Sequence, residues 1–357
     1  MIDLRSDTAS KPTPEMREAI ANAEVGDEQL REDPTVNELE RRAAQTLGQE
    51  DSVFVPTATM ANEIALRVLG EPGDELIAEE NSHILVAELG GPAVHAGLMT
   101  RPLQARAGRF TPEQVRAAAR RGDLCHVPTT RIVSIENTHN ASGGRVWPLG
   151  EVEAMAQTCG ELELSLHLDG ARLFNAAVAS GEEPATIAGH ADTVTICFSK
   201  GLGCPLGAIV AGSSERMLRA RRYKHQFGGA MRQAGIVAAA CVYALDHHVE
   251  RLAEDHARAR LLGERLHEAG VPVDLEQVET NFVQINVGSL GLKENDALER
   301  LVGEGVRLTP TMLPGVLRAV THLAITDEDI DYAIEAIPRA LGVQRSPAKK
   351  NASAATT

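Results

Sequence analysis

The sequence predicts an α/β fold with a mostly parallel central sheet covered by helices, followed by a smaller C-terminal α+β domain. Short apolar runs typical of buried strands alternate with stretches of helical periodicity along the front of the chain, a pattern of parallel sheets covered on both faces. The chain has 357 residues, which is too long for one compact core. After residue 211 the alternation gives way to a long helical region, which indicates a second domain.

The first well-marked helix begins at Asp33-Pro34, an N-cap followed by proline at the first helical position. Apolar residues then recur at helical spacing until Gly48 ends the pattern: Val36, Leu39, Ala43 and Leu47. A buried-strand pattern follows at 52–56, and a helix is expected from about Thr59 to Leu69. Further strand-like runs lie at 75–78, 131–135, 164–168, 193–198 and 208–211.

The rest of the chain is mostly helical from about Ser214 to Ala269, with an interruption at Gly228-Gly229. Strand-like runs at 281–287 and 317–323 and a closing helix after Thr326-Asp327 complete it. We expect four parts: an N-terminal segment that reaches the active site (1–11), a large ligand-binding domain (12–245), a small domain (246–343) and a flexible tail (344–357).

Charge and cysteine usage narrow the function classes. With 35 basic and 50 acidic residues the net charge is −15, which disfavours nucleic acid or an anionic membrane as partner. No apolar run approaches membrane-spanning length, and the first residues lack a signal-peptide core. The five cysteines are scattered without a Cys-x-x-Cys pair, so we expect reduced thiols in a cytoplasmic protein. We expect no metal site, because no His/Asp/Glu cluster has ligand spacing.

Lys200 stands at the mouth of a buried strand, after the run Thr-Val-Thr-Ile-Cys-Phe and before Gly201. Partial desolvation there favours the neutral amine that forms a Schiff base. The ordinary alternative is a strand-end lysine that reaches solvent.

Asp169-Gly170-Ala171-Arg172 follows the preceding strand pattern and strengthens this interpretation. A carboxylate at a strand's carboxyl end lies where α/β folds bind ligands, and it can pair with a protonated pyridine nitrogen. Arg172 could face the same ligand from the first helical turn. The alternative is a capping aspartate beside a surface arginine. Consecutive strand tips could deliver Asp169 and Lys200 to one crevice, which favours a functional site.

A phosphate cradle is indicated by Thr57-Ala58-Thr59, which joins a buried strand to a helix start. Backbone N–H groups, the helix dipole and the threonine hydroxyls favour an anion there, and Ser199 could add a hydroxyl. Thr59 could equally be an ordinary N-cap. Neither the P-loop pattern nor Gly-x-Gly-x-x-Gly after a strand occurs, which argues against nucleotide binding.

The remaining candidates are two histidines and two arginines. His83 follows a strand and could stack on a pyridine ring or act on a substrate hydroxyl; His126 is more ambiguous. Either could be an ordinary surface or core residue. Arg318 and Arg232 are candidate carboxylate or anion clamps, and Arg318 is the better because an arginine inside an apolar strand needs a partner.

Several of these stretches are long enough to be specific. They are Ile2-Asp-Leu-Arg-Ser-Asp-Thr8, Pro56-Thr-Ala-Thr-Met-Ala-Asn62, Asn81-Ser-His83, Glu136-Asn-Thr-His-Asn140, His167-Leu-Asp-Gly-Ala-Arg172, Ser199-Lys-Gly-Leu-Gly203 and Val320-Thr-His322. Together, from about residue 2 to 340, they resemble the low-specificity L-threonine aldolases, which are fold-type-I enzymes that use pyridoxal 5′-phosphate (PLP).

The resemblance implies a role for each candidate. Lys200 would bind PLP covalently, Asp169 would pair with its pyridine nitrogen, and His83 would stack on its ring. Ala58, Thr59 and Ser199 would hold the phosphate, while Arg232 would contribute to a neighbouring subunit's site. Arg172 would lie near the ring hydroxyl of PLP and the substrate carboxylate. Ser6 and Arg318 would share that carboxylate, with His126 near the substrate hydroxyl. The family forms its sites at dimer interfaces and commonly assembles as homotetramers.

The implied reaction is reversible cleavage of β-hydroxy-α-amino acids, such as L-threonine or L-allo-threonine, to glycine and an aldehyde. The base is open between His83, His126 and a water molecule. Departures from the family pattern are Ala58 where glycine is usual, Cys204 where alanine is usual, and the lack of a tyrosine shortly before Glu88. Transamination or β-elimination on the same fold and a non-catalytic binding protein are the alternatives.

Overall fold

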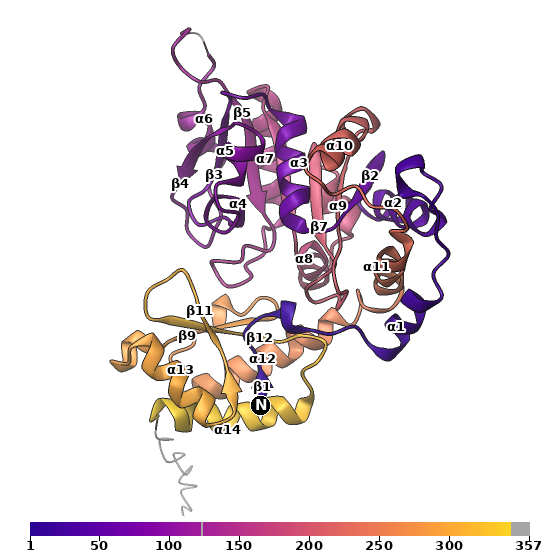
Figure 1. Ribbon diagram of the computed structural model, residues 1–357. Helices are drawn as coiled ribbons and strands as arrows, with labels where there is room; N and C mark the ends of the chain where they lie inside the picture. The colour runs from indigo at the N-terminus through magenta and orange to yellow at the C-terminus, as the bar shows by residue number, and fades with distance from the viewer. Residues whose placement is uncertain (123, 344–357) are drawn as a thin grey trace, which may run out of the picture.

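The computed structural model describes residues 1–122 and 124–343. The expected tail at 344–357 lies outside the described residues. Figure 1 shows a large body built on a central sheet and a smaller body that contains both the N-terminus and the last helix. Among the described residues, no helix is both long and apolar enough to cross a membrane.

The large body contains a seven-stranded sheet among the described residues, in the order β2-β8-β7-β6-β5-β3-β4. Its strands are β2 (Asp51–Val55), β3 (Glu75–Glu79), β4 (Met99–Leu103), β5 (Thr130–Glu136), β6 (Ser165–Gly170), β7 (Thr193–Cys197) and β8 (Ala208–Gly212). Only β8 runs antiparallel to its neighbours in this sheet. The carboxyl ends of β2, β5, β6 and β7 therefore meet at one edge, which confirms the predicted mostly parallel sheet.

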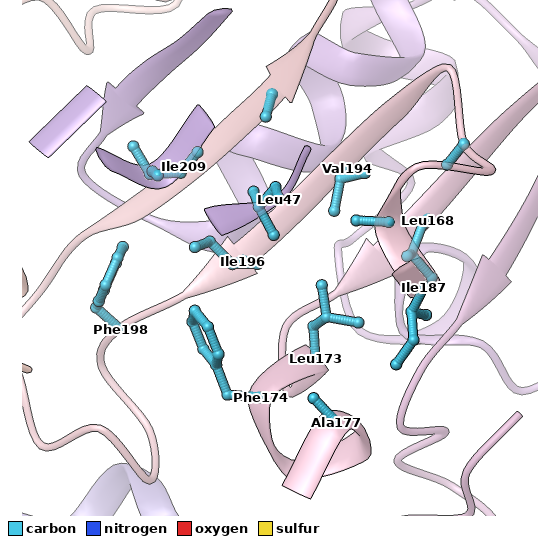
Figure 2. Packing of buried hydrophobic residues seen from close by; sticks show 14 of the residues in the cluster. Leu47, Leu168, Leu173, Phe174, Ala177, Ile187, Val194, Ile196, Phe198 and Ile209 are labelled. Carbon is cyan, nitrogen blue, oxygen red and sulfur yellow. The ribbon is translucent and has the colours of Figure 1, made fainter. Parts of the chain in front are cut away.

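Alternating residues of the strands pack into separate layers on the two faces of the sheet. Val53 and Val55 face α3 and α10, whereas Phe54 faces a larger cluster formed with α1, α2, α7, α8, α9 and α11. Figure 2 shows that cluster, in which Ile196 and Ile209 meet Leu47 and Phe174. The helices are α1 (Pro14–Ala21), α2 (Pro34–Thr46), α3 (Ala58–Leu69), α4 (His83–Val86), α5 (Gly91–His95), α6 (Pro112–Ala118), α7 (Leu149–Glu161), α8 (Leu173–Ser180), α9 (Pro184–Ala188), α10 (Ser214–Gln226) and α11 (Gly235–His247).

The smaller body has its own core. It comprises β9 (Phe282–Asn286), β10 (Val306–Arg307), β11 (Thr309–Pro310), β12 (Val316–Val320), α12 (Leu252–Glu268), α13 (Glu294–Gly303) and α14 (Asp327–Leu341). Leu252 belongs to the large core, whereas Ala259, two turns of α12 further on, belongs to the small one. We propose the domain boundary near residue 246, at the end of α11, with the first turn of α12 still packed on the large core.

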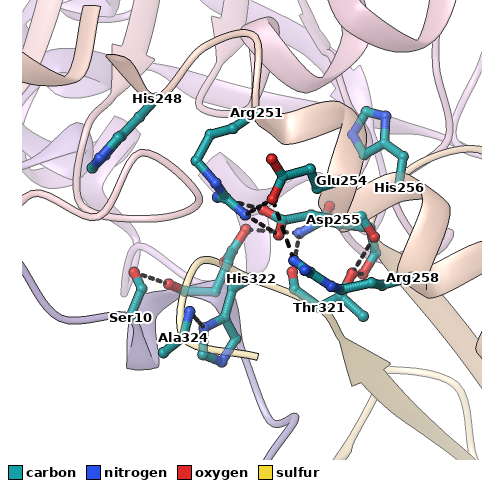
Figure 3. Close-up of polar contacts among 12 residues, drawn as sticks. Ser10, His248, Arg251, Glu254, Asp255, His256, Arg258, Thr321, His322 and Ala324 are labelled. Atoms are coloured by element: carbon teal, nitrogen blue, oxygen red, sulfur yellow. Dashed lines mark hydrogen bonds and ion pairs between the residues drawn. The ribbon is translucent and has the colours of Figure 1, made fainter. Parts of the chain in front are cut away.

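The N-terminal segment ties the two bodies together. Its strand β1 (Ile2–Asp3) pairs with β10, and Ile2 and Leu4 are buried in the small core. The chain then crosses to the large body, where the Ser10 hydroxyl donates to the Lys200 carbonyl at 2.8 Å. Figure 3 shows this junction, in which Thr321 also donates to the Asp255 carbonyl of α12 at 2.6 Å.

Strand β4 was not predicted, because Arg101 and Pro102 interrupt any apolar alternation. It is the edge strand of the sheet, and none of its residues is fully buried. At α3, the N-cap is Thr57, whose hydroxyl accepts from the Met60 N–H at 3.2 Å; Thr59 lies inside the first turn. The predicted cap of α2 is confirmed, since Asp33 accepts from the Val36 N–H at 3.0 Å.

Asp33 also accepts from the backbone N–H groups of Gly26 and Gly235, at 3.2 and 2.8 Å, so one buried carboxylate joins three segments. Asp33→Ala should lower the free energy of unfolding by about 2 to 4 kcal/mol, because a cap is lost and two N–H groups are left unpaired. The matched control is Thr111→Ala, which removes the exposed cap of α6 and should cost about 0.5 to 1 kcal/mol. Denaturant unfolding of the two variants at equal protein concentration checks this; equal losses would contradict it.

Candidate active site

Three consecutive strand tips bring the candidate residues together. Glu136 ends β5 and lies in register with Asp169 of β6, and Lys200 follows β7 by three residues. The turn that carries Lys200 is closed by the Gly203 N–H, which donates to the Lys200 carbonyl at 2.9 Å. Gly203 has φ +76°, so a residue with a side chain would be strained there. The Lys200 side chain is half-buried.

The Asp169 carboxylate is buried and held by two donors. The Asn62 amide donates to one oxygen at 2.9 Å, and the Ala171 N–H donates to the other at 3.1 Å. His167 orients that amide: its Nε2 lies 3.2 Å from the Asn62 amide oxygen and its Nδ1 lies 3.0 Å from the Thr193 hydroxyl. Burial lowers the pKa of His167 to about 4. A neutral ring that donates through Nε2 and accepts at Nδ1 therefore fits this arrangement.

His83 lies beside Asp169 on the same edge. Its backbone N–H donates to Glu136 at 2.7 Å, and its Nδ1 lies 2.8 Å from Oε1 of Glu88. The hydrogen bond with Glu88 raises the pKa of His83, against the opposing effect of burial. Asn62 also donates to Glu88 Oε1, at 2.9 Å, so one amide bridges two carboxylates. Because Nδ1 of His83 is hydrogen-bonded to Glu88, Nε2 is the ring nitrogen that can contact a ligand.

The buried Arg172 and the half-buried Arg318 have different surroundings. Arg172 forms a two-pronged pair with Asp7, with both N–O distances at 2.7 Å. Arg318 donates to the Asn140 amide oxygen at 2.8 Å, and its buried Nε has no acceptor among the described residues. Burial, and then the charge of Arg172, lowers the pKa of Arg318 to about 10. Both guanidinium groups lie over the Phe282 ring, at 4.9 and 5.3 Å from its centroid.

This changes the expectation for Arg172. A guanidinium that already holds Asp7 with two hydrogen bonds is less available to a ligand carboxylate than Arg318, whose buried Nε is unpaired. Ser6 adjoins Asp7, and its hydroxyl accepts from the Thr8 hydroxyl at 2.9 Å and from the Thr8 N–H at 3.2 Å.

The start of α3 lies at the same edge. Thr57 accepts from the N–H groups of Met60, through its hydroxyl, and Ala61, through its carbonyl. The N–H groups of Ala58 and Thr59 precede these and have no partner within the helix, as at every helix start. The hydroxyl of Ser199 lies 3.4 Å from the Cys197 sulfur. Unpaired N–H groups at a helix start, such as those of Ala58 and Thr59, are suited to an anion.

Two sequence candidates are not brought to this edge. His126 is exposed in the connection that leads into β5, so it lies at the amino end of that strand, opposite the tip that carries Glu136. Arg232 is exposed and pairs with Asp27 at 2.9 Å. Within one chain, neither contacts the residues described above.

Sequence reasoning gave no role to four residues that complete the site. Asp7, Asn62 and Asn140 lie within motifs that were recognised, and each holds a charged candidate by a hydrogen bond. Glu88 entered the sequence analysis only as the residue before which the family's usual tyrosine is missing. A carboxamide in the second turn of a helix after a strand is a usable signal for Asn62, but the partners of the other three depend on the packing of distant segments.

The chain matches the family model described as beta-eliminating lyase over residues 3–288. It is 40% identical to the low specificity L-threonine aldolase of Escherichia coli strain K12 over 332 residues, which covers 92% of this chain and 96% of the relative. The fold is similar to a solved threonine aldolase of Leishmania major, with a TM-score of 0.83, 20% identity and coverage of 96% and 100%. It is also similar to a solved structure of SPT with PLP, with a TM-score of 0.72, 18% identity and coverage of 96% and 88%.

These likenesses agree with the architecture and with the residues gathered at the sheet edge. The chain therefore belongs to the beta-eliminating lyase family, and within it to the low-specificity L-threonine aldolases, which are fold-type-I lyases.

Proposed function

We propose that the protein catalyses the reversible, PLP-dependent cleavage of L-threonine, L-allo-threonine and related β-hydroxy-α-amino acids to glycine and an aldehyde. The observation that carries the proposal is the buried Asp169 carboxylate, held by Asn62, at the strand tip next to Lys200. The 40% identity to a low specificity L-threonine aldolase supports the same reaction.

The residues at the sheet edge fit PLP. The cofactor needs an amine for its aldehyde, an anion for its protonated ring nitrogen and N–H donors for its phosphate. Lys200, Asp169 and the start of α3 at Ala58 and Thr59 supply these from one edge, with Ser199 as a further hydroxyl. When bound, PLP accepts the electron pair of the breaking Cα–Cβ bond.

The chain's own residues would hold the substrate. Arg318, with its unpaired buried Nε, is the proposed partner of the substrate carboxylate, with Ser6 beside it. Arg172 is held by Asp7 and keeps positive charge next to that site. The Phe282 ring lies under both guanidinium groups and fixes their spacing.

His83 is the base that the geometry favours for the β-hydroxyl proton. Glu88 holds its Nδ1, so Nε2 accepts the proton and the resulting imidazolium is stabilised by the carboxylate. This adds to the proposed stacking of the same ring on the cofactor. His126 would take part only from a second copy of the chain, because it is exposed away from the edge.

We propose a homotetramer in the cytoplasm, with sites at dimer interfaces to which Arg232 contributes. Large apolar side chains stand exposed in the single chain, among them Leu89 at 98%, Val94 at 74% and Leu30 at 68%. Exposed apolar residues of this size are typical of surfaces that another chain covers.

Lys200→Ala should abolish both turnover and the visible absorption band of the protein with PLP, because the covalent link to the cofactor is lost. Borohydride reduction of the wild-type protein should then trap the cofactor on Lys200, as peptide mass spectrometry would detect. The control is Lys293→Ala, an exposed lysine before α13, which should keep the band. An undiminished turnover in Lys200→Ala would contradict the assignment of Lys200 as the residue that binds PLP.

Arg318→Ala should raise KM for L-threonine about 10- to 100-fold, the equivalent of one charged hydrogen-bonded pair. Arg300→Ala, on the exposed side of α13, serves as the control.

The wild-type protein should convert L-threonine to glycine and acetaldehyde in equal amounts. Ammonia and a keto acid would instead indicate β-elimination, the reaction in the name of the matched family.

A further inference from the structure

Behind His83 lies a buried pair of carboxyl groups. Glu63, in the second turn of α3, is 2% exposed, and Glu88, which follows α4, is 5% exposed. Both oxygens of Glu63 and Oε2 of Glu88 are buried without a hydrogen-bond donor among the described residues. Two ionised carboxylates in that position would carry uncompensated negative charge in an apolar setting, which is costly.

One proton between the two groups resolves this. Glu88 Oε1 already accepts from His83 and Asn62, so Glu88 is the better hydrogen-bond acceptor of the two. Among the described residues no other polar group acts on Glu63, and Gly91 adjoins both Glu63 and Glu88. Burial, and then the charge of Glu88, raises the pKa of Glu63 to about 9. At neutral pH, Glu63 is therefore the carboxylic acid of the pair and Glu88 its acceptor.

The backbone leaves room for this carboxyl. A Cβ atom added to Gly91, the first residue of α5, would lie 2.0 Å from Glu63 Oε1. The Gly91 N–H donates to the Glu88 carbonyl at 2.9 Å, so the same short segment carries Glu88 and provides the space for Glu63.

We propose that Glu63 is a positioning residue: as a neutral acid it donates a hydrogen bond to Glu88 Oε2, and so fixes the carboxylate that holds His83. The chain of contacts runs from Glu63 through Glu88 to Nδ1 of His83. The effect on His83 follows from these contacts alone, whereas the effect on turnover rests on the proposed function.

The charged groups around His83 determine in which direction its pKa should change when Glu63 no longer donates to Glu88. Glu88 and Asp169 favour its protonated form, Lys200 disfavours it, and Glu136 accepts its backbone N–H. Glu88 is the charged group that acts on Glu63 among the described residues. Without the Glu63 donor, the charge on Glu88 is less stabilised and concentrates on its bond with His83. The proton affinity of His83 then increases, and a larger share of the ring is cationic and unable to accept a proton.

The first test is an NMR titration of ¹³C-labelled histidine rings, with and without PLP, using His83→Gln to assign the signal. In Glu63→Leu the pKa of His83 should rise by about one unit, the equivalent of one buried hydrogen bond. In Glu63→Gln, whose amide can still donate to Glu88, it should stay near the wild-type value. An unchanged or lowered pKa in Glu63→Leu would overturn the proposal.

The second test uses the pH dependence of stability to determine whether Glu63 is protonated in the folded protein. A group whose pKa is raised in the folded chain weakens the fold as pH rises from its unfolded value near 4.5 to its folded value near 9. Glutamine has no such proton, so Glu63→Gln should not lose stability in this way. The Tm of Glu63→Gln minus the Tm of the wild type should therefore increase as the pH rises from 5.5 to 8.5. A difference in Tm that is constant across this range would mean that Glu63 is ionised in the fold.

The pH dependence of the kinetics tests whether the change in the pKa of His83 affects turnover. The acidic limb of the pH profile of kcat/KM should move about one unit upward in Glu63→Leu and stay in place in Glu63→Gln, with the cofactor band present in both. A limb that does not move, in a protein whose His83 signal does shift, would overturn the catalytic part of the proposal. If no aldehyde forms from wild-type protein, the proposed function fails, while the NMR and Tm tests still decide the role of Glu63.

Discussion

The compensation of buried charge at the tip of β6 is the constraint on which the site depends. The Asp169 carboxyl is buried, so its oxygens require hydrogen-bond donors. Asn62 and the Ala171 N–H provide them, which fixes the second turn of α3 over the strand tip. The same amide reaches Glu88, and the neutral ring of His167 fixes which way the amide points. A sheet edge, a helix and the loop of His83 are thus oriented by one carboxamide.

The second half of the site depends on the meeting of the two bodies. Arg172 comes from the large body, Arg318 and Phe282 from the small one, and Asp7 from the segment that connects them. Asn281 adds a contact to Asp7, at 3.4 Å, and donates to the Thr321 carbonyl at 3.0 Å. Arg172 and Arg318 therefore come together only when both bodies and the N-terminal segment are in place, and the proposed substrate site lies where the two cores meet.

The sequence was most informative where a functional residue directly follows a recognisable strand or helix pattern. Lys200 and Asp169 follow apolar strand runs, and parallel strands place such residues on one edge without any knowledge of distant contacts. The strands of the large sheet other than β4, strands β9 and β12, and the cap at Asp33 were predictable for the same reason. The two-residue strands β1, β10 and β11 were not predicted, because they are too short to show a pattern. The pairing of Arg172 with Asp7 was not, since 165 residues separate them and nothing local distinguishes a paired arginine from a free one. Glu63 is the extreme case, because in sequence it resembles an ordinary helical glutamate.

The pairing of β1 with β10 has a consequence for the order in which the protein is completed. Residues 2 and 3 leave the ribosome about 300 residues ahead of their partners Val306 and Arg307. At about 5 to 20 residues per second, the segment that carries Asp7 waits roughly 15 to 60 s for the strand that anchors it. During that time the large body can fold, but the N-terminal strand has no β10 to pair with. Arg318, on β12, emerges later still, so the proposed substrate site can form only near the end of synthesis.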